Sequence, residues 1–123
     1  MAKIYLDANV LIGLIEKRRN LDDELLQQHT VFISPLSIHI LCYLYKYKMP
    51  EGKLADLEDT MKLIPLNNKV ANYSLLGPTS DFEDNVQLHS AAEANCDLFV
   101  TNDKKLLSMK FFGKTKIISP EEL

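Results

Sequence analysis

The stretch Ile4-Tyr5-Leu6-Asp7-Ala8-Asn9-Val10-Leu11, close to the N-terminus, decides the fold. In residues 3–6, three apolar residues follow Lys3, a run that is typical of a short buried strand. From Val10 onwards the apolar residues change to a helical spacing, which continues to Ile15. The stretch therefore predicts a strand followed directly by a helix, with Asp7 at the junction.

The same alternation continues to the end of the chain. Further strands are predicted at residues 31–33, 63–66, 98–101 and 116–118. Further helices are predicted at residues 20–28, 35–48, 69–76, 81–95 and 103–108, and another begins at residue 54 and extends at least to residue 61. Because strands and helices alternate, we expect one three-layer α/β/α domain over residues 1–123, with a central parallel sheet flanked by helices. The helix at residues 35–48 is apolar on more than one side, which predicts deep packing.

The composition is that of an ordinary globular domain and argues against several other classes of protein. Of the 123 residues, 46% are hydrophobic and 25% are charged, as in an ordinary globular domain. The net charge of −3 argues against a basic DNA-binding module, because such modules concentrate lysine and arginine to neutralise phosphates. No apolar run is long enough to span a membrane, and Cys42 and Cys96 lack a CxxC spacing. We therefore expect a cytoplasmic protein with reduced cysteines.

Four aspartates are candidate ligands for a cation. Asp7 and Asp103 lie at the ends of predicted strands, where open α/β sheets bind ligands. Asp81 and Asp84 are three residues apart and share one face of a predicted helix. Carboxylates gathered at one sheet edge would repel one another unless a cation neutralised them. An all-oxygen site of this kind favours Mg²⁺ or Mn²⁺.

Each acid also has a purely structural interpretation. Asp7 fits a turn or a helix cap. Asp81 and Asp103 fit the position before a helix, where a carboxylate accepts from free N–H groups, and Asp84 would be stabilised by the helix dipole. Taken singly, these structural roles are the simpler explanation, and only the joint placement favours a metal site. Lys104 and Lys105 follow Asp103, so they form either a solvated face or a local basic edge beside the acid.

Four segments together resemble the PIN domain family, especially its VapC-like toxin branch. They are the opening stretch at residues 4–11 and residues 33–37, 81–84 and 98–103, in that order. The resemblance implies an endoribonuclease that uses Mg²⁺ or Mn²⁺ to cleave single-stranded RNA. It also implies a homodimer and a cognate antitoxin.

The resemblance assigns roles to residues by position. The catalytic residues that hold metal would be Asp7, Asp84 and Asp103, with Asp81 close to the metal. Asn9 and Thr101 would support these carboxylates by hydrogen bonds.

The chain departs from the family pattern at residue 40. PIN nucleases usually carry a glutamate three residues after a Ser or Thr, and here the residue three after Ser37 is Ile40. His39 does not replace the acid, because it points about 100° away around the helix. One carboxylate fewer weakens metal binding, so the departure predicts reduced activity.

Other interpretations stay open at this level. A catalytically degenerate PIN domain that binds RNA or protein would also lack the acid at residue 40. A phosphoacceptor receiver domain has similar length and element order, but the paired acids expected early in such a chain are missing. A haloacid-dehalogenase-like phosphatase would use Asp7 as nucleophile, but the second aspartate of its motif would be Asn9.

Overall fold

The computed structural model describes residues 1–16 and 27–123. Its elements are β1 (Lys3–Leu6), α1 (Ala8–Ile15), β2 (Thr30–Ile33), α3 (Pro35–Tyr45), α4 (Gly52–Ala55), α5 (Leu57–Thr60), β3 (Met61–Leu63), α6 (Asn68–Leu76), α7 (Phe82–Glu93), β4 (Leu98–Val100), α8 (Lys104–Met109), β5 (Phe111–Phe112), β6 (Thr115–Ile118) and the 3-10 helix η1 (Pro120–Glu122). The helix predicted at residues 20–28 falls largely outside the described residues. Within the described ranges, no helix has the length and apolar character needed to cross a membrane.

Strand β1 lies in the middle of a mostly parallel sheet. Among the described residues, the strand order is β3-β2-β1-β4-β6-β5. β1 pairs in parallel with β2 and β4, so Tyr5 lies between Phe32 and Phe99. The other pairs are also parallel, except that β5 runs antiparallel to β6. The carboxyl ends of β1, β4 and β6 therefore meet at one edge, the edge at which open α/β sheets bind ligands.

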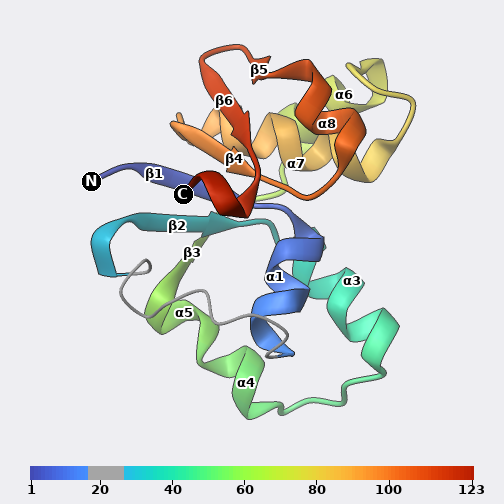
Figure 1. The fold of residues 1–123 in the computed structure, drawn as a ribbon. Helices are drawn as coiled ribbons and strands as arrows, with labels where there is room; N and C mark the ends of the chain where they lie inside the picture. Colours follow the sequence, from blue (N-terminus) through green and yellow to red (C-terminus); the bar gives the residue numbers. More distant parts are fainter. Residues whose placement is uncertain (17–26) are drawn as a thin grey trace.

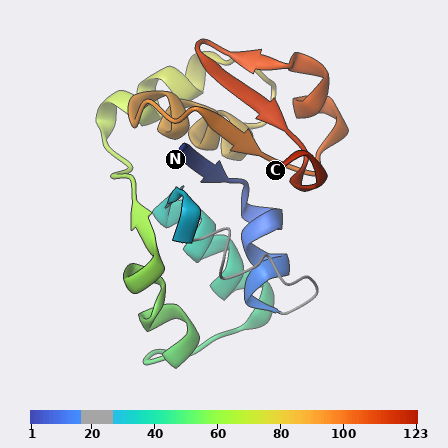
Figure 2. The same ribbon diagram turned by 60° about the vertical axis from the view of Figure 1, so that its left-hand side comes forward.

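Helices cover both faces of this sheet. Side chains alternate along β1, so that Ile4 and Leu6 join one apolar cluster with Leu11 of α1, while Tyr5 joins a second cluster with Leu88 of α7. Figures 1 and 2 show α1, α3, α4 and α5 on one side of the sheet and α6 and α7 on the other. The predicted α/β/α fold with a central parallel sheet is confirmed.

The segment between residues 52 and 63 differs from the prediction. The apolar spacing predicts one helix from residue 54 to at least residue 61, whereas the chain forms two short helices, α4 and α5, and then strand β3. Met61 pairs in parallel register with Val31, and both residues are buried. Met61 thus gains both a strand partner and burial in the strand conformation, which outweighs the helical spacing. The strand itself lies two residues earlier than the predicted range of 63–66.

Helix α3 is shorter and more exposed than its sequence predicts. It ends at Tyr45, and of its residues only Ser37 and Leu41 are buried. Leu44 is 56% exposed, so the prediction of deep packing is wrong. The physical reason is that α3 packs along α1 through one face and leaves apolar residues on another face in contact with solvent.

Candidate active site

Asp7 lies at the junction between β1 and α1 and is only 3% exposed. The Thr101 hydroxyl donates to its Oδ2 at 2.6 Å, and the Asp7 N–H donates to the carbonyl of Val100 at 2.9 Å. Burial raises the pKa of Asp7, and the hydrogen bond from Thr101 is the largest effect that offsets it. The chain thus keeps a carboxyl group at the sheet edge and holds it with a buried hydroxyl.

Thr101 connects Asp7 to Asp103. The hydroxyl oxygen that donates to Asp7 also accepts from the Asp103 N–H at 3.0 Å. Asp103 in turn caps α8, because its Oδ1 accepts from the N–H groups of Lys105 and Leu106 at 2.8 and 3.3 Å. The end of β4 and the start of α8 therefore hold both acids through one buried hydroxyl.

Asp81 and Asp84 lie at the start of α7. Asp81 caps the helix, since its Oδ1 accepts from the Asp84 N–H at 3.0 Å. Asp84 is half-buried, and its pKa is raised to about 6, first by burial and then by the charges of Asp81, Asp7 and Asp103. The charges of the three other acids therefore reach Asp84.

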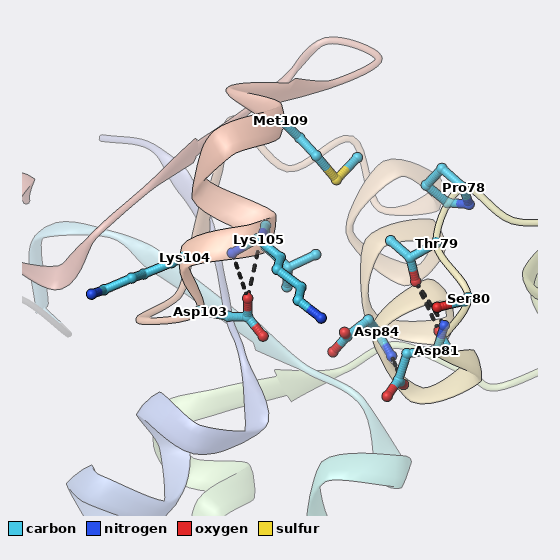
Figure 3. A pocket seen from close by; sticks show the side chains of 10 residues that line it. Pro78, Thr79, Ser80, Asp81, Asp84, Asp103, Lys104, Lys105 and Met109 are labelled. Carbon is cyan, nitrogen blue, oxygen red and sulfur yellow. Dashed lines mark hydrogen bonds between the residues drawn. The ribbon is translucent and has the colours of Figure 1, made fainter.

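A pocket of about 710 Å³ opens between the starts of α7 and α8. Its lining includes Asp81, Asp84 and Asp103, together with Lys104 and Lys105. Figure 3 shows the carboxylates of Asp84 and Asp103 facing each other across this pocket. The side chain of Lys105 points towards Asp84, whereas that of Lys104 points away from the pocket (Figure 3).

The sequence matches the PIN domain family over residues 4–111, a range that contains every acid described above. The chain belongs to the PIN domain family. A search of curated proteins finds no match to this chain.

Solved structures share the fold of this PIN domain. VapBC2 from Rickettsia felis, bound to a DNA fragment from its promoter, has 19% identity and a TM-score of 0.67, with 95% of this chain and 98% of that chain covered. DNA-bound VapBC from Salmonella typhimurium has 20% identity and a TM-score of 0.68, with 97% and 98% covered. At these identities the likeness establishes the fold.

The donor set of the PIN domain suits a hard divalent cation. All of the candidate ligands are carboxylate oxygens, which Mg²⁺ and Mn²⁺ prefer. The pKa of Asp84 is raised first by burial and then by repulsion from neighbouring acids, which a cation would relieve. Among the described residues, however, no three His, Cys, Asp or Glu side chains are close enough to hold one ion together. The site fits the metal in its chemistry, although the described side chains do not form a set of three ligands.

Asn9 and Ile40 relate to the site differently from what the family pattern implies. Asn9 is exposed on the first turn of α1, and no hydrogen bond between described residues links it to Asp7, Asp84 or Asp103. Ile40 is half-buried and packs against the apolar cluster that contains Leu11. The position of the expected glutamate is therefore in contact with the core.

Gln87 is a residue of the site that the sequence pattern does not indicate. This residue is 2% exposed, and its Oε1 accepts from the N–H of Ala8 at 2.8 Å. The one available signal is its spacing, because it lies three residues after Asp84 on the same helix face.

Proposed function

We propose that this PIN domain is a metal-dependent endoribonuclease of the VapC-like toxin type, which cleaves single-stranded RNA in the cytoplasm. The observation that carries the proposal is that Asp81, Asp84 and Asp103 line one pocket, and that burial and the charges of Asp81, Asp7 and Asp103 raise the pKa of Asp84. A protein retains such a cluster at a cost in stability, and a bound cation offsets that cost. The family membership and the shared fold with VapBC complexes support the toxin assignment.

The proposed roles follow the position of each residue. Asp7, Asp84 and Asp103 would hold Mg²⁺ or Mn²⁺, with Asp81 beside them. When bound, the metal would supply an activated water and stabilise the charge that develops on the phosphodiester. The Thr101 hydroxyl would keep the Asp7 carboxylate in place by its 2.6 Å hydrogen bond.

The lysines of α8 would contact the RNA backbone. Lys105 is the stronger candidate, because its amine end points to the acidic side of the pocket in Figure 3, and Lys104 would act from further out. A cation beside a carboxylate cluster lets a polyanionic substrate approach without net repulsion. Asn9, which is exposed at the start of α1, would contribute by reaching the bound metal or RNA rather than by supporting an acid.

The absence of an acid at residue 40 favours reduced activity, and it also motivates a second candidate function. In that alternative the domain binds RNA or a protein partner without cleaving RNA, which agrees with the lack of a preformed ion cage in the described residues. Incubation of single-stranded RNA with the protein and Mn²⁺ distinguishes the nuclease from the domain that only binds. Cleavage that Asp7→Asn and Asp103→Asn abolish supports the nuclease, whereas binding without cleavage supports the alternative.

The proposal includes two protein partners, an antitoxin and a second copy of this chain. We expect an antitoxin because the two similar structures are both VapBC assemblies bound to DNA. Co-expression with the neighbouring reading frame, followed by light scattering on the purified protein or complex, measures both associations.

A further inference from the structure

We propose that Gln87 is a positioning residue that orients the Asp7 carboxylate by tying α7 to the junction between β1 and α1. The inference rests on the proposed function, since it concerns the residue that would set the geometry of one metal ligand.

Gln87 lies at the meeting point of three elements. It is buried one turn below Asp84 on the same face of α7. Its Oε1 accepts from the N–H of Ala8 at 2.8 Å and from the hydroxyl of Tyr5 at 3.4 Å. Ala8 begins α1 and Tyr5 belongs to β1, so one amide oxygen holds α7 against both sides of Asp7.

The two donors also fix the orientation of the Gln87 amide. Because Oε1 faces both N–H and O–H groups, Nε2 must lie on the opposite side and act as a donor. Gln87 therefore contacts the residues on either side of Asp7, while the Thr101 hydroxyl donates to the Asp7 carboxylate. A neutral amide suits this position better than a cation, because it leaves the negative charge of Asp7 available to a metal.

Asp84 and Gln87 on α7 therefore lie at different depths and have different roles. Asp84 faces the pocket, while Gln87 below it contacts the residues on either side of Asp7. The amide thus sets the distance between two ligands that belong to different elements. Partners of this kind, which contact a ligand rather than the metal, commonly change metal affinity about 10- to 100-fold when they are removed.

Gln87→Met is the first test, because methionine has similar length and volume but no amide. We expect Mn²⁺ affinity, measured by calorimetry, to fall about tenfold. Thr115→Val is the matched control, since the Thr115 hydroxyl makes a buried 2.8 Å hydrogen bond to the Cys96 carbonyl, away from the pocket. This control should lower the melting temperature and leave Mn²⁺ affinity unchanged.

Gln87→Glu gives an independent result if Gln87→Met does not fold. Glutamate keeps an oxygen for the Ala8 N–H but puts a second negative charge beside Asp7. Because a bound ion would neutralise that charge, Mn²⁺ should raise the melting temperature of Gln87→Glu more than that of the wild type. An equal or smaller rise overturns the proposal, as does wild-type Mn²⁺ affinity in Gln87→Met.

Asp7→Asn distinguishes a failure of the proposed metal site from a failure of the role proposed for Gln87. If Asp7→Asn binds Mn²⁺ normally, the metal site of the proposed function is wrong; if only Asp7→Asn loses affinity, the role of Gln87 is wrong.

Discussion

The substitution Asp84→Asn tests whether burial and the neighbouring acids destabilise the charged form of Asp84. Burial and the charges of Asp81, Asp7 and Asp103 raise the pKa of Asp84 from 3.8 to about 6. That difference corresponds to about 3 kcal/mol, which we reduce to about 1–2 kcal/mol because the partly exposed carboxylate is screened by solvent. The charge also interacts favourably with the start of α7, by about 0.5 kcal/mol. Without metal at about pH 8, Asp84→Asn should therefore be more stable than the wild type by about 1 kcal/mol.

The pH dependence provides the decisive measurement. Since the pKa is higher in the folded than in the unfolded protein, ionisation of Asp84 destabilises the fold as pH rises from about 4 through about 6. Below this window the carboxyl group is protonated in both states, so variant and wild type should have nearly equal stability. Urea denaturation in EDTA at about pH 4, 6 and 8 follows the difference. Asp59→Asn removes the same charge from an exposed residue of α5 and should show no such trend. A stability difference independent of pH, or a less stable Asp84→Asn at the highest pH, would refute the argument that the charge of Asp84 destabilises the fold.

Three further predictions address the metal, the RNA and the missing acid. Mn²⁺ or Mg²⁺ should bind at millimolar concentrations, and Asp7→Asn or Asp103→Asn should abolish the calorimetric signal; unchanged affinity in both variants would mean that the site is misplaced. Lys105→Glu should weaken RNA binding and flatten its salt dependence more than Lys104→Glu, because only Lys105 points towards the acids in Figure 3, and equal salt slopes in both would contradict this. Ile40→Glu should raise Mn²⁺ affinity and RNA cleavage about 100-fold if residue 40 faces the metal. If it contacts only the core, the buried charge should instead lower stability by several kcal/mol, with no rescue by Mn²⁺ in thermal melts.

The sequence predicted the fold best where the apolar pattern and the burial agree. The strand, junction and helix at residues 3–15 form as expected, because the run that favours a strand is also buried on both faces. The segment at residues 54–61 shows the opposite case, since a helical spacing yields to pairing with β2. Strand β5 has only two residues, too few for any periodicity, and forms through its pairing with β6.

The same distinction explains which site residues could be predicted. Asp7, Asp81 and Asp103 lie next to recognisable strand ends or helix starts, so local pattern alone places them. Gln87 has no such signal, because its oxygen contacts an N–H group 79 residues away in the sequence. A contact of this kind depends on the packing of α7 against the β1–α1 junction, which only the folded chain provides.

The acids of the site can both cap helices and bind metal. They differ, however, in whether helix capping alone explains their presence. Asp81 and Asp103 each use one oxygen to cap a helix, so their presence is explained without any ligand. Asp7 precedes α1 but makes no side-chain capping hydrogen bond, and it is buried with a raised pKa. Asp84 likewise has its pKa raised by burial and by its acidic neighbours. An asparagine at residue 7 or 84 would fill the same space without the electrostatic cost. The charges that burial and repulsion disfavour are therefore the strongest structural argument for the cation site that we propose at this end of the sheet.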